Sequence, residues 1–378
     1  MTLVFKINDY FCQVYFCHMN LLNQKRKEKN IKINELASSL GVDSSLMSRI
    51  LSNKRKPTRE QLKKLAILLD VNIIDLLKEF LADEVVSIVK EYPQIAHEIL
   101  IVAEERVQYL MSNQKFKLIN LSKEINEELK SIDSLKNKWD KCRPLNQLQL
   151  KKMEEYFYTS YTYESNRIEG NTLTLQETHL VINEGITIGG KSMSEHLEAI
   201  NHKEAIELIK DLVQNKTPLN SYRLKQLHQL ILKGIDNRNA GKYRDVPVRI
   251  SGSSHIPPEP YMIEKMMEDY FMFYETQKSA LHPVILAAEM HERLVSIHPF
   301  IDGNGRASRL IMNLILLQNG YTIANLKGNL TDRMSYYNAL EKVQVNHESD
   351  DFFQLIIAHV HESLNEHIHL AGNPSLSV

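Results

Sequence analysis

Apolar side chains recur every three to four residues along most of this chain, which is the spacing of one face of an α-helix. The pattern is clear in residues 118–132, where leucine or isoleucine occupies positions 118, 121, 125, 129 and 132. Residues 310–317 form a nearly continuous apolar stretch, which predicts a buried helix. Glycine and proline number only 13 and 11, so the turn signals typical of an all-β protein are scarce. The sequence therefore predicts a mostly α-helical protein.

Breaks in the helical pattern divide the chain into parts. A length of 378 residues exceeds what one hydrophobic core usually supports, so two or three domains are expected. The predicted parts are, in order, an N-terminal extension (1–18), a compact helical domain (19–80), a helical connector (81–145), a large helical domain (146–370) and a tail (371–378). Whether the extension belongs to the natural protein or precedes a start at Met19 is left open.

The compact domain is basic, although the whole chain is nearly neutral. Residues 19–80 contain 13 Lys and Arg against 7 Asp and Glu, a net of +6, whereas the complete chain has a net charge of −1. Residues 33–51 read as helix, turn at Gly41, and a second helix that Asp43 or Ser44 can cap. A basic domain with this arrangement is a candidate for binding an acidic partner.

This segment resembles the λ-repressor/Cro-like helix-turn-helix family, in which residues just after the turn enter the major groove of double-stranded DNA. The resemblance implies two sets of contacts. Base-reading positions would be Ser44, Ser45, Ser48 and Arg49, and phosphate contacts would come from Lys54, Arg55 and Lys56. The alternative is a Lys-rich helical bundle that docks on a protein partner.

Composition bears on the compartment. The three cysteines (Cys12, Cys17 and Cys142) form neither a metal-binding pattern nor a disulfide framework, as expected in a reducing compartment. No stretch approaches the roughly 20 apolar residues of a membrane span, and the N-terminus lacks the layout of a signal peptide. A cytoplasmic protein without a membrane anchor is expected.

Candidate chemistry is concentrated in residues 298–309, which read His-Pro-Phe-Ile-Asp-Gly-Asn-Gly-Arg-Ala-Ser-Arg. A glycine-containing loop that opens a helix is an anion site, because free backbone N–H groups and the helix dipole face the ligand. Arg306 and Arg309 lie on the first turns of that helix and can contact phosphate oxygens. Asp302 offers a hard oxygen ligand for Mg²⁺, and His298 can act as a base near neutral pH.

This segment matches the signature of the Fic family, His-x-Phe-x-(Asp/Glu)-Gly-Asn-Gly-Arg-x-x-Arg, at all its fixed positions. The resemblance implies a Fic-type helical core over 146–370 and transfer of AMP from ATP, with Mg²⁺, to a Ser, Thr or Tyr hydroxyl of a target protein or of the chain itself. His298 would be the base and Asp302 would hold Mg²⁺. Nucleotide binding would fall to Asp302, Gly303, Asn304, Gly305, Arg306 and Arg309, joined by Tyr336 and Tyr337 near the adenine.

Residues 165–170 resemble the inhibitory motif of the same family, (Ser/Thr)-x-x-x-Glu-(Gly/Asn), with Ser165, Glu169 and Gly170 in the fixed positions. Glu169 is expected at the end of an inhibitory helix, paired with Arg309, where it would occupy the place that the γ-phosphate needs. The intact motif also leaves open that Glu169 supports AMP removal.

Two further segments follow from the resemblance. Residues 246–255 resemble the Fic flap, a β-hairpin that clamps an extended target segment, with Ile250, Ser251, Gly252 and Ser253 at its tip. An ordinary surface hairpin is the alternative. Gln344 stands where a metazoan relative has an asparagine that contacts the nucleotide, which leaves the nucleotide preference open.

The sequence leaves two alternative functions open and excludes a third. The Fic-like core could serve only as a nucleotide sensor for a DNA-binding regulator, although its motif is complete. Other Fic-type reactions, such as transfer of another phosphate-containing group, are also consistent with the motif. Zinc hydrolysis at His291-Glu292 fails because the second histidine would be needed at position 295, which is valine. The target protein, the DNA site and a homodimeric state are not decided by the sequence.

Overall fold

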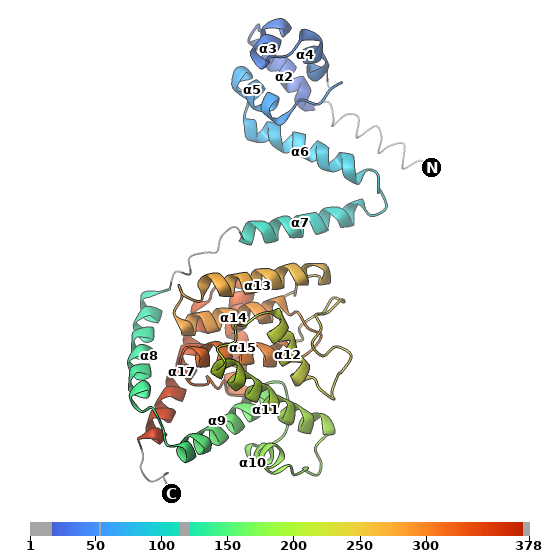
Figure 1. The fold of residues 1–378 in the computed structure, drawn as a ribbon. Coiled ribbons are helices and arrows are strands. Elements are labelled where there is room, and N and C mark those ends of the chain that lie inside the picture. The colour runs from blue at the N-terminus through green and yellow to red at the C-terminus, as the bar shows by residue number, and fades with distance from the viewer. Residues whose placement is uncertain (1–16, 53, 114–118, 120, 373–378) are drawn as a thin grey trace. The chain divides into compact units, whose positions relative to one another are not determined.

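The structure is a computed structural model that describes residues 17–52, 54–113, 119, 121–372 of the chain (Figure 1). The predicted extension (1–18) and tail (371–378) lie almost entirely outside the described residues. The chain separates into two compact units, with the division between residues 115 and 116. Each unit is described by itself. The predicted mostly helical fold is confirmed.

The small unit is built on five short helices around an apolar core. Its helices are α2 (Cys17–Glu28), α3 (Ile33–Leu40), α4 (Ser44–Leu51), α5 (Arg59–Leu69) and α6 (Ile73–Val89), followed by α7 (Ala96–Asn113). Gly41 adopts a left-handed conformation, with φ of 69°, which lets α3 end and α4 begin without a steric penalty. The Asp43 carboxylate then caps α4 by accepting from the Leu46 amide at 2.7 Å. The sequence predicted both features.

The segment interpreted as one connector, residues 81–145, is divided between the units. Helix α7 and the end of α6 belong to the small unit, whereas α8 (Lys123–Lys141) packs along α17 (Asp350–Ala371) in the large unit. The apolar face of α8 is fully used in this contact, with Ile125 and Ile132 both 0% exposed. Its amphipathic pattern therefore reflects packing on a helix more than 200 residues away in sequence.

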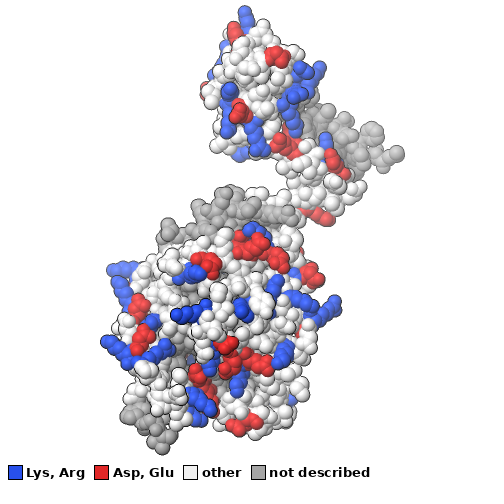
Figure 2. All heavy atoms as spheres, viewed as in Figure 1, with Lys and Arg blue, Asp and Glu red and all other residues white. Residues whose placement is uncertain are grey.

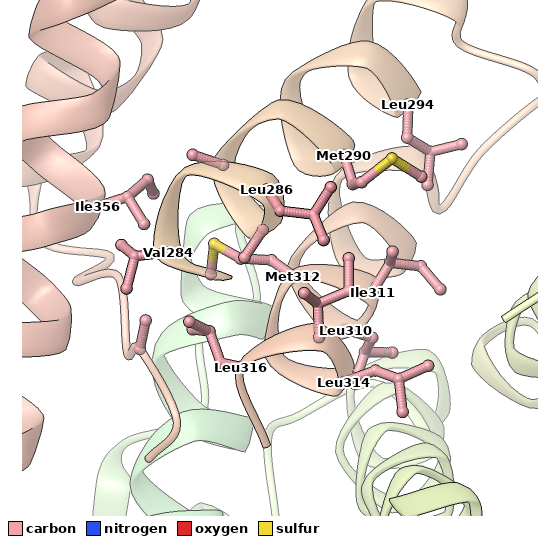
Figure 3. Packing of buried hydrophobic residues seen from close by; sticks show 14 of the residues in the cluster. Val284, Leu286, Met290, Leu294, Leu310, Ile311, Met312, Leu314, Leu316 and Ile356 are labelled. Atoms are coloured by element: carbon pink, nitrogen blue, oxygen red, sulfur yellow. The ribbon is translucent and has the colours of Figure 1, made fainter. Parts of the chain in front are cut away.

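The large unit is arranged around two antiparallel neighbours, α14 (Pro283–Ile297) and α15 (Asn304–Gln318), whose packing is the most extensive in the protein. Figure 3 shows Leu286, Met290 and Leu294 of α14 beside Ile311 and Leu314 of α15. The predicted buried stretch 310–317 lies in α15. Around this pair lie α9 (Gln147–Ile168), α10 (Leu175–His179), η1 (Leu180–Glu184), α11 (Met193–Gln214), α12 (Ser221–Ile231), η2 (Pro260–Met262), α13 (Ile263–Gln277), α16 (Leu330–Glu341), η3 (Lys342–Asn346) and α17.

The predicted β-hairpin over residues 246–255 is not confirmed, because none of the described residues lies in a strand. Residues 246–258, here called the flap loop, form an irregular segment with a turn in which the Ser253 amide donates to the Ile250 carbonyl at 3.3 Å. Pro247, Pro257 and Pro258 lack the N–H groups that strand pairing needs. Side-chain hydrogen bonds from outside the loop hold it instead, as described below.

Among the helices that the structure describes, none combines the length and the apolar character needed to cross a membrane.

Candidate active site

His298 is the residue that ends α14, and its backbone is in the left-handed region, with φ of 49°. This conformation is costly for a residue other than glycine and persists only where its surroundings hold it. The imidazole Nδ1 lies 3.2 Å from the Val295 carbonyl oxygen, so Nδ1 carries the proton and donates. The opposite nitrogen, Nε2, is then unprotonated and able to accept a proton. Burial lowers the pKa of His298, and the nearby positive charge of Arg244 lowers it further.

The motif loop between α14 and α15 is held by an internal clasp. The Asn304 Oδ1 accepts from the Phe300 amide and its Nδ2 donates to the Phe300 carbonyl, both at 2.9 Å. The Phe300 ring is fully buried and anchors the loop in the core. Both ends of the Asn304 amide are thus used within the loop, a role that sequence reasoning, which placed Asn304 against the nucleotide, did not anticipate.

His228 of α12 supports the same loop from outside. Its Nδ1 accepts from the Gly241 amide at 2.9 Å, so its Nε2 carries the proton and donates to the Asp302 carbonyl at 2.8 Å. The ring also stacks on Phe300 at 3.6 Å between centroids. Burial lowers the pKa of His228 to about 4, which keeps it neutral in this tautomer. Nothing in the sequence around His228 marks it as part of the site.

Asp302 and Arg306 lie at the mouth of the loop. The Asp302 side chain is 65% exposed, its Oδ1 accepts from the Gly303 amide at 2.6 Å, and its Oδ2 lies 3.4 Å from Arg306 Nη2. The Arg306 guanidinium is almost completely buried, yet its Nε and Nη1 have no hydrogen-bond partner. The Glu198 carboxylate lies 3.7 Å from Nη1, too far for a hydrogen bond, so buried donors of Arg306 remain for an anionic ligand.

The predicted pairing of Glu169 with Arg309 is present. Glu169 follows the last residue of α9, and its Oε1 lies 2.6 Å from Arg309 Nη2. Ser165 completes the contact, because its hydroxyl and its carbonyl oxygen accept from Arg309 Nε and Nη2 at 3.0 and 2.9 Å. Burial would raise the pKa of Glu169, but Arg309 and Arg306 lower it by more, so the net pKa is depressed. The carboxylate is therefore ionised at neutral pH.

The Glu169 carboxylate also lies against the first turn of α15. A Cβ atom built on Gly305 would come within 2.4 Å of Glu169 Oε1, so only glycine fits there while the ion pair is closed. Gly170 has φ of 99°, which lets the chain leave α9 directly after Glu169. All three predicted inhibitory residues and the motif loop are thus brought together.

The two predicted adenine-side tyrosines differ in their surroundings. Tyr336 is 3% exposed, and its hydroxyl lies 3.0 Å from His291 Nε2, so it is part of the core. Tyr337 is 41% exposed and donates to the Ile168 carbonyl at 3.2 Å, at the end of α9. Gln344, on the short helix that follows α16, has a buried Nε2 without a partner. Of the two tyrosines, Tyr337 is therefore the one with an exposed surface.

The flap loop is anchored at both ends and in the middle by side chains. Arg244 donates to carbonyl oxygens at its two ends, Val246 and Pro258. The Ser254 amide donates to Glu341 Oε1 at 3.0 Å, and His255 Nε2 donates to the Ser296 carbonyl at 2.9 Å. The predicted tip, Ile250 to Ser253, forms the turn, with Gly252 at φ of 81°.

Zinc binding finds no support in the geometry. His291 is fully buried and bonded to Tyr336, and burial lowers its pKa to about 3. No group of three His, Cys, Asp or Glu residues in the described part of the chain is arranged to hold a metal ion.

In the small unit, all seven predicted DNA-contacting residues are exposed on α4 and the turn that follows it. Figure 2 shows Lys and Arg side chains at several places on the visible face of this unit, with some Asp and Glu side chains among them. The arrangement leaves the seven residues free to meet a partner.

Each of the two units matches a known protein family. The Fic/DOC family model matches residues 218–316, and a helix-turn-helix model matches residues 22–76. Curated relatives named protein adenylyltransferase Fic include those of Nematostella vectensis, 34% identical over 60% of this chain, and Drosophila grimshawi, 38% identical over 46%. The chain covers 52% and 35% of the length of these two relatives.

Solved structures agree on the fold. A Fic domain containing signaling protein from Bacteroides thetaiotaomicron is 30% identical, with a TM-score of 0.59, and the match covers 64% of this chain and 96% of that one. Fic-1 from C. elegans (aa134–508) has a TM-score of 0.60 at 22% identity, covers 92% of this chain and 96% of that one, and shows a shared fold. With the signature at 298–309, the nearly complete match to the Bacteroides protein and the helix-turn-helix match at the N-terminus, this chain belongs to the Fic/DOC family and carries a helix-turn-helix domain ahead of its Fic domain.

Proposed function

We propose that this protein is an adenylyltransferase that moves AMP from ATP to a hydroxyl group of a target protein and is held inactive by Glu169. The observation that carries the proposal is that the Glu169 carboxylate is ion-paired with the buried Arg309 at 2.6 Å and lies against Gly305, at the first turn of the helix that the motif loop opens. Such a site binds phosphates through positioned donors and positive charge.

The reaction follows from the placement of these groups. His298 Nε2 takes the proton of the target hydroxyl, whose oxygen then attacks the α-phosphorus of ATP. The new phosphorus–oxygen bond replaces the bond to the bridging oxygen of the β-phosphate, and pyrophosphate leaves with that oxygen. Arg306 and Arg309 balance the charge on the departing phosphates, and the free amides at the start of α15 orient them.

The residues at the mouth of the loop fit the magnesium ion that accompanies ATP. Mg²⁺ commonly binds through one or two carboxylates, with water and phosphate oxygens completing its shell. Asp302 offers a single, 65% exposed carboxylate at this place, which suits that mode better than a closed protein cage. When bound, the ion would neutralise phosphate charge, and Asp302 would hold it.

Glu169 would block the reaction by occupying the donors of Arg309. Glu169 Oε1 accepts from Arg309 Nη2 at 2.6 Å, and a carboxylate oxygen in this position competes with a phosphate oxygen for the same N–H group. The pKa of Glu169 is depressed, so the block is present at neutral pH and would be lost only as the pH falls through that lowered pKa. The same carboxylate is also placed to orient a water for AMP removal, which is the alternative reaction of this site.

Labelled ATP tests the reaction type. Protein incubated with ATP labelled at the α-phosphate should retain the label, and protein incubated with ATP labelled at the γ-phosphate should not. Label retained only from the γ-phosphate would replace the proposal with phosphate transfer. A parallel reaction with UTP examines the nucleotide preference, which the glutamine at position 344 leaves open.

We propose further that the helix-turn-helix domain binds double-stranded DNA. The supporting observation is that the base-reading and phosphate-contacting candidates lie together, exposed, on and just after α4 of a domain with a net charge of +6 over residues 19–80.

Neutralising Lys54, Arg55 and Lys56 together should weaken DNA binding and flatten the slope of log affinity against log salt by about 2–3 units. The measurement is a salt titration of duplex binding by the full chain. Neutralising the exposed Lys63, Lys64 and Lys90 is the matched control for charge alone. Equal slopes for the two triple variants, or no binding at low salt, would reassign the domain to protein docking.

A further inference from the structure

Arg244, which no motif marks, is a buried arginine whose hydrogen bonds all end on the catalytic and target-binding segments. It is 3% exposed, and among the described residues no carboxylate forms a direct ion pair with it, although the charge of Glu259 partly offsets the lowering of the Arg244 pKa by burial. Buried arginines are usually paired with an acid, because an uncompensated charge is costly in the interior. Its charge is instead spread over backbone carbonyl oxygens.

Those carbonyl oxygens belong to three separate points of the chain. Arg244 Nε donates to the His298 carbonyl at 2.8 Å, Nη1 to the Val246 carbonyl at 3.0 Å and Nη2 to the Pro258 carbonyl at 2.5 Å. The Arg244 backbone amide adds a fourth bond, to the Pro299 carbonyl at 2.8 Å. One guanidinium therefore ties the motif histidine to both ends of the flap loop.

The bond to His298 supplies a partner for a carbonyl oxygen at the end of α14. His298 has a left-handed backbone and lies at the C-terminal end of α14, where carbonyl oxygens lack partners within the helix. A planar fork with donors in three directions can satisfy this carbonyl and the two flap carbonyls at once, which an ammonium group cannot do with the same geometry.

We infer that Arg244 is a positioning residue that sets the distance between the His298 base and a target segment held on the flap loop. This inference rests on the proposed AMP transfer. Arg244 bonds the motif loop only at its start, through the His298 and Pro299 carbonyls, whereas the nucleotide-binding candidates begin at Asp302, so Arg244 should affect the chemical step and leave ATP affinity unchanged.

The test uses the full chain with Glu169→Gly, in which the inhibitory contact is absent, and follows AMP incorporation into the protein itself. Adding Arg244→Lys should lower the rate about tenfold, and Arg244→Gln should lower it further, because small displacements of reacting groups cost large factors in rate. The affinity for ATP with Mg²⁺ should stay within a factor of about two of the parent. Arg238→Lys, at an exposed arginine of the same segment, is the matched control.

The pH profile separates positioning from general loss of structure. His298 is faced by Arg244 and His255 from the loop side and, in the unmodified chain, by Glu169 from α9. Arg244→Gln removes a positive neighbour, so the acid limb of the rate should move to higher pH, whereas Arg244→Lys keeps the charge and should leave the limb in place. If Arg244 were only structural, the acid limb would not shift in Arg244→Gln while staying in place in Arg244→Lys.

Failure of the proposed AMP transfer and failure of the positioning role of Arg244 give different results. No AMP incorporation in the Glu169→Gly parent counts against the proposed function itself. An active parent with an equally active Arg244→Lys variant overturns the positioning role, as does a parallel loss of ATP affinity and rate. Should both variants fail to fold, the Arg244 Nε–H in the unmodified chain decides by NMR: slow exchange with solvent supports the bond to His298, and fast exchange overturns the inference.

Discussion

Glu169→Gly should raise AMP transfer about 100-fold, because it frees Arg309 for the γ-phosphate and removes the carboxylate that lies against Gly305. A misplacement of phosphates by about 1 Å is sufficient for an effect of this size. The same change should end any AMP removal, since the group that would orient water is gone. The measurement is the initial rate of AMP incorporation at saturating ATP.

Two further variants complete this experiment. Glu91→Gly, at an exposed glutamate in a turn of the small unit, should have no effect and controls for the substitution itself. Arg309→Ala should be inactive and should not be rescued by Glu169→Gly, because the arginine that holds the inhibitor also serves the nucleotide. Equal rates for the unmodified chain and Glu169→Gly would show that Glu169 only ends α9 and that control lies elsewhere.

His298→Ala, made in the Glu169→Gly background, should reduce transfer by about 10²–10⁴-fold, the usual cost of removing a positioned general base. ATP binding should be nearly unchanged, because the imidazole donates to the Val295 carbonyl, whereas the phosphate-binding candidates are the Arg306 and Arg309 guanidinium groups and the amides at the start of α15. Rates and ATP affinities measured side by side test both statements.

The pH dependence adds an independent check on His298. Its pKa is lowered from the ordinary 6.5, so the neutral, proton-accepting form persists below neutral pH, and the acid limb of the parent's rate should lie below pH 6.5. Glu169 raises this pKa, so removing it should move the limb no higher. A His298→Ala variant that labels within a few-fold of its parent would exclude the histidine as the base.

The sequence predicted the helices and the motif loop because both depend on local information. Helical periodicity is carried by residues a few positions apart, and the turn at Gly41 and the cap at Asp43 involve neighbours. The inhibitory pair was also predictable, although 140 residues separate Glu169 from Arg309, because two recognisable motifs carried its two partners.

Features that depend on unmarked tertiary contacts were missed. His228 reaches Asp302 across 74 residues, and Arg244 reaches His298 across 54, with no motif around either residue. The amphipathic pattern of α8 is consistent with a connector and with a packed helix, and only its partner α17 distinguishes them.

In the flap loop, by contrast, the sequence predicted an element that the structure does not contain. β-Branched residues between prolines favoured a hairpin, but strand pairing needs backbone donors that Pro247, Pro257 and Pro258 cannot supply. The segment takes its shape from Arg244, His255 and Glu341 instead. Backbone shape in such a loop is set by side-chain contacts, several of them with residues distant in sequence such as Ser296 and Glu341, which residue propensities do not capture.

Intact-mass spectrometry of the Glu169→Gly protein, incubated with ATP and Mg²⁺, tests the central claim most directly. The account predicts that the protein gains the mass of one AMP group, that the gain requires ATP, and that it disappears when His298→Ala is added. A gain of one phosphate group, or no change in mass in the Glu169→Gly protein while it binds ATP, would contradict the proposal that this site transfers AMP to protein hydroxyls.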